Sequence, residues 1–378
     1  MADRSFLDWP FFEARHRELA AALDDWCVAH LPVDHADVDA ACRGLVAALG
    51  QAGFLRHSGA GEGERLDVRS LCLIRETLAR HDALADFVFA MQGLGMGAVS
   101  LFGTPGQREW LERTRAGRAI SAFALTEPGS GSDVANTATL AEQVEGGWRL
   151  TGEKTYISNG GIADIYVIFA RTGEAPGARG LSAFLMPADS PGLTIAERIE
   201  VIAPHPLARL RLDGVFLPDA ALIGKPGEGF KLAMSVLDVF RPTVGAAALG
   251  MARRALDEAL TRVQDRRIQG QPLSDLQMVQ GHLADMALKV DAAALLVYRA
   301  AWVKDQGAPR ITREAAMAKL FATEAAQEVI DAALQLHGGD GVRKGFAVES
   351  LYRDIRALRI YEGASDVQRI VIARSILP

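Results

Sequence analysis

The sequence predicts a multidomain α+β fold: an N-terminal α-helical domain, a middle β-barrel or β-sandwich domain and a C-terminal four-helix bundle. Three changes of pattern support this. Apolar residues have helical spacing up to about residue 118, short β-type runs follow from residue 120, and long Ala-rich helical segments begin near residue 230. The 378 residues exceed the length at which one core usually stops growing, so several domains are expected. We place them at residues 1–119, 120–226 and 227–378.

The first region reads as a series of helices. Leu19, Leu23 and Trp26 recur three or four positions apart, as they do on one face of a helix. Pro32, Gly53 and the Gly-Thr-Pro segment at 103–105 predict breaks between these helices.

The middle region contains short β-type runs separated by turns. They cover residues 121–125, 148–151, 165–170, 181–186 and 210–217. Because no long helical pattern interrupts them, a small antiparallel barrel or sandwich is expected rather than a βαβ sheet.

The last region contains three long helical segments, at 230–266, 275–306 and 312–337, followed by a terminal helix. This pattern predicts a helix bundle. Pro242 lies inside the first segment and predicts a kink or break near Arg241.

Composition excludes several classes of protein. The balance of 41 basic and 47 acidic residues gives a net charge of -6, which argues against a nucleic-acid surface. Cys27, Cys42 and Cys72 have no paired or metal-type spacing, so neither a disulfide framework nor a metal site is expected. The N-terminus lacks a signal-peptide pattern, and the apolar runs fall short of a membrane span. We therefore expect a soluble, cytoplasmic protein.

A glycine- and hydroxyl-rich loop follows the first β-type run. Its sequence, residues 125–133, is Leu-Thr-Glu-Pro-Gly-Ser-Gly-Ser-Asp. Glycines let a ligand approach the backbone, and Thr126, Ser130 and Ser132 add donors, a chemistry suited to phosphate or a heteroaromatic ring. An ordinary polar turn is the alternative. A P-loop is excluded because no lysine follows the glycines.

A second candidate segment is the strand that begins at Lys154 and runs into an Asn-Gly turn. Tyr156 and Ser158 are two positions apart and are expected to share one face of this strand. A flat ring beside a donor could pack on a planar cofactor, although the strand and its turn explain the same residues.

Glu362 lies among apolar neighbours just before the last helix. Ser365 and Gln368 form a Ser-x-x-Gln pattern typical of a capping box, so Glu362 is not needed as a cap. Two interpretations remain open on this segment alone: a favourable negative charge near a helix N-terminus, or a catalytic base.

Other patterns argue against nicotinamide or triad chemistry. Gly93, Gly95 and Ala98 fit a loose Gly-x-Gly-x-x-Ala pattern, but no βαβ unit surrounds it, and a helix with small residues is the better interpretation. No catalytic triad or nucleophile elbow is present, and His337 is expected to be structural.

Residues 125–133 and the Tyr-Glu-Gly-Ala-Ser segment at 361–365 resemble the two signatures of the acyl-CoA dehydrogenase family. The resemblance extends from about Phe12 to Leu377, in the helical, β, helical order of that fold. It implies an FAD-dependent flavoprotein in which FAD lies between the β-domain and the C-terminal bundle and reaches a neighbouring subunit of a homotetramer, a dimer of dimers.

The resemblance also implies a set of cofactor residues. Thr126 would bond the flavin ring, Tyr156 and Ser158 would lie beside it, and Arg266 would reach the FAD pyrophosphate of a partner subunit. The full cofactor set is Leu125, Thr126, Ser132, Tyr156, Ser158, Arg266, Gln269, Gln335 and Gly339.

Substrate contacts are implied in the same way. Asp238 and Arg241 match positions that contact the thioester arm of CoA, and the full set is Ser132, Asp238, Arg241, Tyr361 and Gly363. The walls of the acyl pocket are expected around residues 87–97 and near Leu237. Gly93, Gly95 and Gly97 would leave room there for a branched or cyclic tail, unless they serve close backbone packing.

The sequence departs from the family pattern at three positions. Gln269 replaces an aromatic residue that often precedes Gly270, Ala364 stands where threonine is common, and Tyr156 replaces the more usual tryptophan. These changes would loosen FAD or retune the flavin, but none removes the base.

The implied reaction is α,β-dehydrogenation of an acyl-CoA to the trans-2-enoyl-CoA. Glu362 would remove the pro-R α-proton while the β-hydrogen leaves as hydride to flavin N5. The backbone N–H of Glu362 and a ribityl hydroxyl would bond the thioester carbonyl. An electron-transfer flavoprotein is the expected acceptor, and neither a metal, nor nucleic acid, nor a membrane is involved.

Four alternatives share this scaffold. A dehydrogenase of carrier-protein thioesters differs only at the distant handle, and an acyl-CoA oxidase differs in its reaction with oxygen. A flavin monooxygenase is disfavoured by Glu362. A non-catalytic protein that binds flavin and acyl thioester would leave FAD oxidised.

Overall fold

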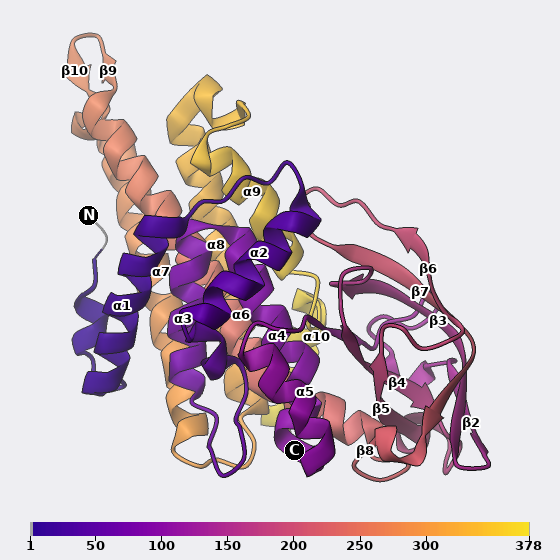
Figure 1. Cartoon of the computed structure of the whole chain (residues 1–378). Coiled ribbons are helices and arrows are strands. Elements are labelled where there is room, and N and C mark those ends of the chain that lie inside the picture. Colours follow the sequence, from indigo (N-terminus) through magenta and orange to yellow (C-terminus); the bar gives the residue numbers. More distant parts are fainter. Residues whose placement is uncertain (1–2, 378) are drawn as a thin grey trace. The chain divides into compact units, whose positions relative to one another are not determined.

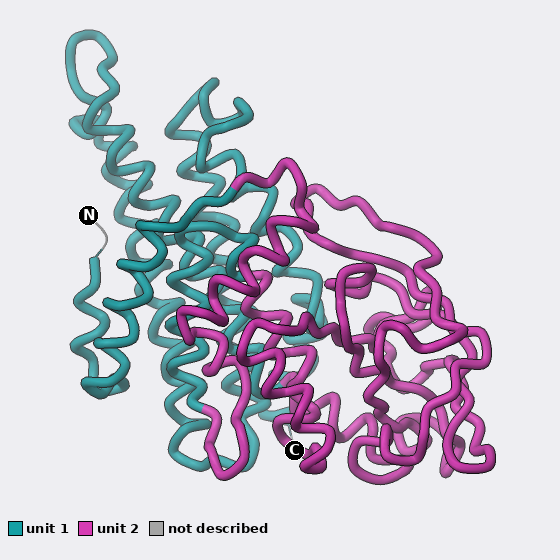
Figure 2. The backbone as a smooth tube through the Cα atoms, viewed as in Figure 1, with its two compact units in different colours: residues 1–33, 67–86, 238–378 teal, residues 34–66, 87–237 magenta. Residues whose placement is uncertain are grey.

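The computed structural model describes residues 3–377, in which a set of helices is followed by a sheet and then by further helices (Figure 1). This order confirms the predicted α+β class. The chain forms two compact units, one from residues 1–33, 67–86 and 238–378, the other from residues 34–66 and 87–237 (Figure 2). Each unit therefore combines segments that are distant in the sequence. The boundaries at residues 119 and 226 stay a prediction.

Five α-helices precede the sheet: α1 (Ala14–His30), α2 (Val38–Gln51), α3 (Val68–His81), α4 (Ala83–Phe102) and α5 (Pro105–Arg115). Local chemistry explains several of their starts. Asp37 and Asp67 accept backbone N–H groups at the starts of α2 and α3, and Thr104 with Gln107 forms a capping box before α5. The predicted break at residues 103–105 is confirmed.

The Gly93–Ala98 pattern lies inside α4, which confirms that it is helical. Gly95 packs against the start of the sheet, because a Cβ atom there would lie 2.4 Å from the Ser121 hydroxyl. At this position, close packing rather than open pocket space explains the glycine.

The middle region is one eight-stranded sheet, with strand order β6-β7-β3-β2-β4-β5-β8 and β1 beside β4. Its strands are β1 (Ser121–Ala124), β2 (Leu140–Val144), β3 (Gly147–Ser158), β4 (Ile165–Arg171), β5 (Leu181–Pro187), β6 (Leu193–Arg198), β7 (Leu207–Pro218) and β8 (Leu222–Ile223). The sheet is mixed, so a purely antiparallel expectation is wrong. The β2–β3 hairpin lies between β1 and β4 in the chain and lets these two strands pair in parallel.

The C-terminal helices are α6 (Gly229–Asp265), α7 (Gln277–Asp305), α8 (Thr312–His337), α9 (Ala347–Leu358) and α10 (Ser365–Ile376). A hairpin of β9 (Arg267–Ile268) and β10 (Gln271–Pro272) projects from the end of α6 (Figure 1). Of the predicted kink or break near Arg241, the break is wrong, because α6 continues through Pro242, and the kink stays a prediction. The flanking residues Phe240 and Val244 are buried, and their packing offsets the hydrogen bond that proline removes.

Helices α4 and α6 are apolar over longer stretches than expected from the sequence. By length and composition each could cross a membrane, but 83% of each apolar window is buried inside the protein. Burial of this kind is typical of core helices.

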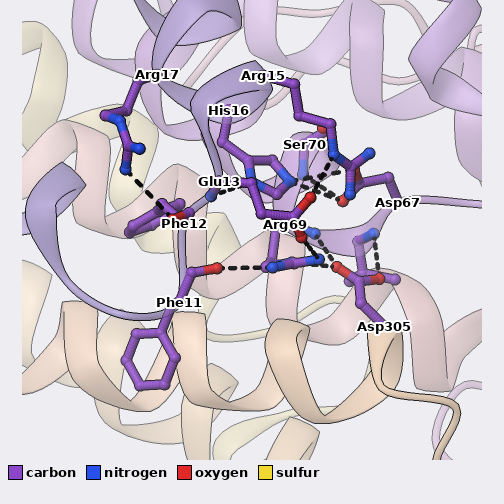
Figure 3. A network of polar contacts seen from close by, with 11 residues as sticks. Phe11, Phe12, Glu13, Arg15, His16, Arg17, Asp67, Arg69, Ser70 and Asp305 are labelled. Carbon is purple, nitrogen blue, oxygen red and sulfur yellow. Dashed lines mark hydrogen bonds and ion pairs between the residues drawn. The ribbon is translucent and has the colours of Figure 1, made fainter.

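A network of hydrogen bonds and ion pairs connects α1 with α3 and α7 (Figure 3). Asp67 caps α3 and lies 3.1 Å from the His16 ring nitrogen of α1. Arg69 donates to Asp305 of α7 at 2.7 Å and to Glu13, just before α1, at 2.8 Å. These contacts fix the N-terminal end of α3, the helix that also carries Arg75.

Candidate active site

The loop after β1 is held in place by a buried carboxylate. Glu127 accepts hydrogen bonds from the backbone N–H groups of Ala138 at 2.6 Å and Thr139 at 3.0 Å. The Lys154 ammonium donates to Glu127 at 2.7 Å and to the Leu125 carbonyl at 3.1 Å. Glu127 and Lys154 therefore tie the start of the loop to the chain that follows it and to β3.

This ion pair is almost fully inside the protein, Glu127 being 6% and Lys154 0% exposed. Burial opposes ionisation of Glu127, but Lys154 and the backbone N–H groups outweigh it and lower the Glu127 pKa. Burial lowers the pKa of Lys154 to about 8, and Glu127 counteracts part of this shift. Neither residue of this pair was among the site residues predicted from the sequence.

The loop itself offers unused hydroxyl groups. Thr126 is half-buried and Ser132 is exposed, and no residue within 3–377 hydrogen-bonds to either side chain. The Ser130 hydroxyl instead donates to the Asp133 carbonyl at 2.5 Å, so the loop uses it internally. Two of the three predicted donors are thus free for a ligand.

Tyr156 lies beside this loop with an exposed ring. The Thr155 N–H donates to the Thr126 carbonyl at 2.9 Å, which brings β3 next to the loop. Tyr156 has a φ of 53° at a register shift between Lys154 and Ile157, and it is 62% exposed. An exposed aromatic residue in this strained conformation is typical of a ligand site.

Ser158 completes this cluster. It is half-buried, Ile157 before it is fully buried, and no described residue hydrogen-bonds to the Ser158 hydroxyl. A free ring with free hydroxyl donors on either side fits the planar, hydrogen-bonding flavin that the resemblance implies.

The other compact unit holds Glu362, in a tight turn between α9 and α10. Glu362 has a φ of 53° and Gly363 a φ of 93°. Three side chains donate to their carbonyls: Arg241 and Gln368 to Glu362, each at 3.2 Å, and Gln368 and Lys319 to Gly363, at 2.9 and 2.8 Å. These donors arrive from α6, α8 and α10 and hold a left-handed turn that a glutamate rarely adopts.

The predicted capping box at Ser365 and Gln368 is wrong. Ala364 occupies the cap position without a side-chain hydrogen bond, and the Ser365 hydroxyl donates to Glu324 at 2.5 Å. The Gln368 amide turns back to the carbonyls of the turn instead, because those acceptors would otherwise be left unpaired.

The Glu362 carboxylate is partly unpaired. Its Oε2 atom is buried and has no hydrogen-bond partner in the described part of the chain. Burial raises the Glu362 pKa, while the cations Arg75, Arg241 and Lys319 act against this rise. A half-buried carboxylate with one buried, unpaired oxygen is a candidate general base.

Arg75 reaches the same region from α3. It donates to both oxygens of Asp86, each at 2.8 Å, and to the Thr243 hydroxyl at 3.0 Å. This bidentate pair largely neutralises the Arg75 charge.

Four of the five predicted substrate residues, Asp238, Arg241, Tyr361 and Gly363, lie in the same compact unit as Glu362, whereas Ser132 belongs to the other unit. Asp238 and Arg241 lie one turn apart on α6 with their charged atoms 3.8 Å apart, and the Thr312 hydroxyl donates to Asp238 at 2.9 Å. Arg241 is 7% exposed, and burial lowers its pKa. Tyr361, just before Glu362, is 38% exposed.

The remaining cofactor candidates lie at one end of the helical unit. Arg262 of α6 bonds Asp340 at 3.0 Å and the His337 carbonyl at 3.1 Å, which joins the ends of α6 and α8. The residues near this junction are exposed: Arg266, Gln269, Gln335 and Gly339. They can therefore meet a ligand from outside this unit.

Several residues around the loop after β1 and around Glu362 were not predicted from the sequence. Four of them are charges inside an apolar or Ala-rich run, as for Lys319 between Ala318 and Ala322, whereas Glu127 and Lys154 lie among polar residues and glycines. A buried charge needs a partner, so such positions are a usable signal. The missed residues are Arg75, Asp86, Glu127, Lys154, Lys319 and Glu324.

Comparison with known proteins identifies one family. Sequence models of acyl-CoA dehydrogenase match the whole arrangement: the N-terminal domain at residues 13–118, the middle domain at 122–215 and the C-terminal domain at 227–377.

Individual relatives agree with this match. The mitochondrial short-chain specific acyl-CoA dehydrogenase of Bos taurus is 40% identical over 324 residues, covering 85% of this chain and 77% of the relative. The cyclohexane-1-carbonyl-CoA dehydrogenase of Geobacter metallireducens is 39% identical over 323 residues, covering 84% of each.

Solved structures have the same fold. Butyryl-CoA dehydrogenase from Megasphaera elsdenii superposes with a TM-score of 0.89 at 30% identity, over 97% of this chain and 99% of the other. A glutaryl-CoA dehydrogenase from Mycobacterium smegmatis in complex with FADH2 gives 0.89 at 27% identity, over 97% and 95%.

Proposed function

This chain belongs to the acyl-CoA dehydrogenase family of FAD-dependent oxidoreductases, and we propose that it oxidises a short acyl-CoA to the trans-2-enoyl-CoA with Glu362 as the base. The observation that carries this proposal is the Glu362 carboxylate, with one buried oxygen that no described residue hydrogen-bonds. A carboxylate with a pKa raised by burial binds an α-proton more strongly than an exposed one.

The backbone around Glu362 supplies the second requirement. Removing an α-proton places negative charge on the thioester oxygen, which needs a donor. The Glu362 N–H has no acceptor among residues 3–377, whereas the carbonyls of Glu362 and Gly363 are already occupied. The free N–H supports a role in binding the thioester oxygen.

The residues on and beside the loop after β1 would hold the cofactor. Thr126 and Ser158 would bond the flavin, Tyr156 would pack beside its ring, and Ser132 would reach the phosphates or the substrate arm. When bound, FAD supplies the acceptor for the hydrogen that leaves the β-carbon. Arg266, Gln269, Gln335 and Gly339 are exposed together and would hold the FAD of a neighbouring subunit.

The substrate arm would lie along α6. Arg241 donates to the Glu362 carbonyl and pairs weakly with Asp238. A substrate group that contacts Arg241 or Asp238 would therefore also act on the turn that carries Glu362. Tyr361 and Gly363 flank the base on either side.

A short acyl chain is the substrate class we favour. The bovine relative acts on short chains and the Geobacter relative on a cyclic acyl group, according to their names. Gly95 does not open the roomier pocket that a cyclic group needs, because strand β1 fills the space beside it. A carrier-protein thioester and oxidase activity are the alternatives.

Assembly into a homotetramer is part of the same proposal. Leu288, Leu295 and Trp302 recur every seven residues along α7 and are 69%, 48% and 37% exposed. An apolar stripe of this kind is a typical helix-packing surface. We further propose a cytoplasmic enzyme that passes electrons to an electron-transfer flavoprotein.

The test is anaerobic titration of the FAD-loaded protein with acyl-CoAs of graded length and branching. Flavin bleaching strongest with butyryl-CoA and other short straight-chain acyl-CoAs is the expected result. Bleaching only by branched or cyclic acyl-CoAs would contradict the short-chain assignment. Rapid reaction of the reduced protein with oxygen would favour an oxidase.

A further inference from the structure

We propose that Lys319 is a positioning residue for Glu362: its ammonium group fixes the turn that carries the base, and its charge keeps that base ionised in the free enzyme. This inference rests on the proposed function and concerns the same site. Lys319 lies in the first half of α8, 43 residues before Glu362 in the chain, and was not among the site residues predicted from the sequence.

The geometry of the turn places Lys319 directly on it. The side chain is 0% exposed, and its Nζ donates to the Gly363 carbonyl at 2.8 Å. Glu362 has a φ of 53°, a left-handed conformation that is unfavourable for a residue with a side chain. A strong donor on the adjacent carbonyl helps to hold that conformation and hence the direction of the carboxylate.

Satisfying a carbonyl does not by itself explain a buried cation. The Gln368 amide already donates to the Gly363 carbonyl at 2.9 Å. A neutral side chain would avoid the cost of removing an ammonium group from water. The charge of Lys319 therefore needs a separate reason.

The charges around Glu362 provide that reason. Arg75 on α3 is paired with Asp86 at the start of α4, and Arg241 on α6 is paired with Asp238. Lys319 on α8 differs, because no carboxylate in residues 3–377 forms an ion pair with it.

Two nearby charges on other segments are already matched. Glu324 of α8 and Arg359, just after α9, both influence Lys319, but they pair with each other at 2.6 Å. The positive charge of Lys319 is therefore left to act on Glu362. In agreement, burial lowers the Lys319 pKa to about 8 while Glu362 acts to raise it.

Two substitutions separate the two roles of Lys319. Lys319→Met removes both the donor and the charge, whereas Lys319→Gln keeps an amide donor without charge. Lys289→Met is the matched control, because Lys289 lies on α7 and pairs with Glu328 at the surface. The readouts are the limiting rate of anaerobic flavin reduction, its half-saturation by butyryl-CoA and the pH dependence of both.

Removal of the cation should raise the pKa of Glu362. In a plot of the limiting rate against pH, the part that rises with pH should then move to higher pH by about one unit in both Lys319 variants. Lys319→Met should also lower the limiting rate by about tenfold or more above that rising part, since the turn loosens, with half-saturation changed less than threefold. Lys319→Gln should lower this limiting rate less than Lys319→Met does. Lys289→Met should behave as the unmodified enzyme.

A limiting rate and pH profile within twofold of the unmodified enzyme in both Lys319 variants would overturn the inference. A change confined to half-saturation would do the same, because it would make Lys319 a substrate contact. If Lys319→Met does not fold, the rising part of the pH profile of Lys319→Gln decides. Glu362→Gln is measured in parallel: unimpaired bleaching there would contradict the proposed function itself, whereas its loss together with normal Lys319 variants contradicts only this inference.

Discussion

The turn at Glu362 and Gly363 is held by side chains from other parts of the chain. The two residues have φ values of 53° and 93°, and side chains from three helices donate to their carbonyls. Because these donors bond to the backbone, they leave the Glu362 carboxylate free. The conformation of the base is thus set by the bundle rather than by its neighbours in sequence.

Gly363→Ala tests whether this conformation is required. A Cβ atom at Gly363 would lie 2.5 Å from the Gln368 amide nitrogen, and a side chain is strained at this φ. We expect a loss of about 1–3 kcal/mol in the free energy of unfolding, with FAD still bound and flavin bleaching slowed at least tenfold. Urea unfolding and anaerobic stopped-flow absorbance measure the two effects.

Gly281→Ala is the control for this substitution. Gly281 lies in α7, and no atom lies within 4 Å of a Cβ placed there. Alanine should therefore stabilise the helix by up to about 1 kcal/mol and leave bleaching unchanged. If Gly363→Ala behaves in the same way as this control, the strained turn is not needed.

At this scale the sequence predicted the base but not its supports. Glu362 stands out because it is a carboxylate next to glycine and an aromatic residue. Arg75 and Lys319 could not be connected with it, since they are distant in the chain and only the fold brings them near. The Ser365 and Gln368 pattern misled for a related reason: their side chains found partners in Glu324 and in the turn, which no local pattern encodes.

At the scale of elements, the loop after β1 depends on one buried ion pair. Glu127 bonds to Lys154 and to the backbone of Thr139, and these contacts leave the hydroxyls of Thr126 and Ser132 unused. The shape of the cofactor loop should therefore depend on charges that do not touch the cofactor.

Lys154→Met should be strongly destabilising for this reason. It leaves the Glu127 carboxylate buried beside Thr139 without its cation, which typically costs about 3–5 kcal/mol. FAD affinity should fall as well. The free energy of unfolding in urea and the release of FAD fluorescence on dilution report the two losses.

The double variant Glu127→Gln/Lys154→Met separates charge from packing. Because it buries no unpaired charge, it should regain more than half of the lost stability. Equal loss in the single and double variants would show that the pair acts only through its shape.

Element boundaries were predicted well where the pattern is strong. The third helix of the bundle was predicted at 312–337 and is observed at Thr312–His337, because its Ala-rich face is buried along its length. The break at Pro242 failed because tertiary packing carries α6 through the proline. Parallel pairing of β1 with β4 could not be predicted, since register between distant strands is set by the whole sheet.

For the whole molecule, the order of helices, sheet and helices follows directly from changes in sequence pattern. The division into two compact units does not, because each unit is assembled from separate segments of the chain. The exposed residues at the ends of α6 and α8 are the ones proposed to meet a second copy of the chain and its FAD.

Arg266→Ala tests that idea. Arg266 is exposed and follows α6 directly, so its loss should not unfold the bundle. We expect weaker FAD binding together with a weaker tetramer, measured by flavin release and by sedimentation velocity. Its neighbour Arg267, whose side chain donates only to the Gly270 carbonyl at 3.4 Å among the described residues, supplies the control variant Arg267→Ala. Loss of FAD without any change in assembly would contradict the assembly half of the prediction.

The central claim is that Glu362 removes the α-proton, and Glu362→Gln tests it most directly. The glutamine keeps the size of the side chain but cannot accept the proton as a carboxylate does. The measurement is the rate of anaerobic flavin bleaching by butyryl-CoA in the FAD-loaded variant, with bound FAD determined first from its absorbance. A normal FAD content with a rate reduced by about 10²–10⁴-fold is predicted. A rate within tenfold of the unmodified enzyme would contradict the assignment of Glu362 as the base.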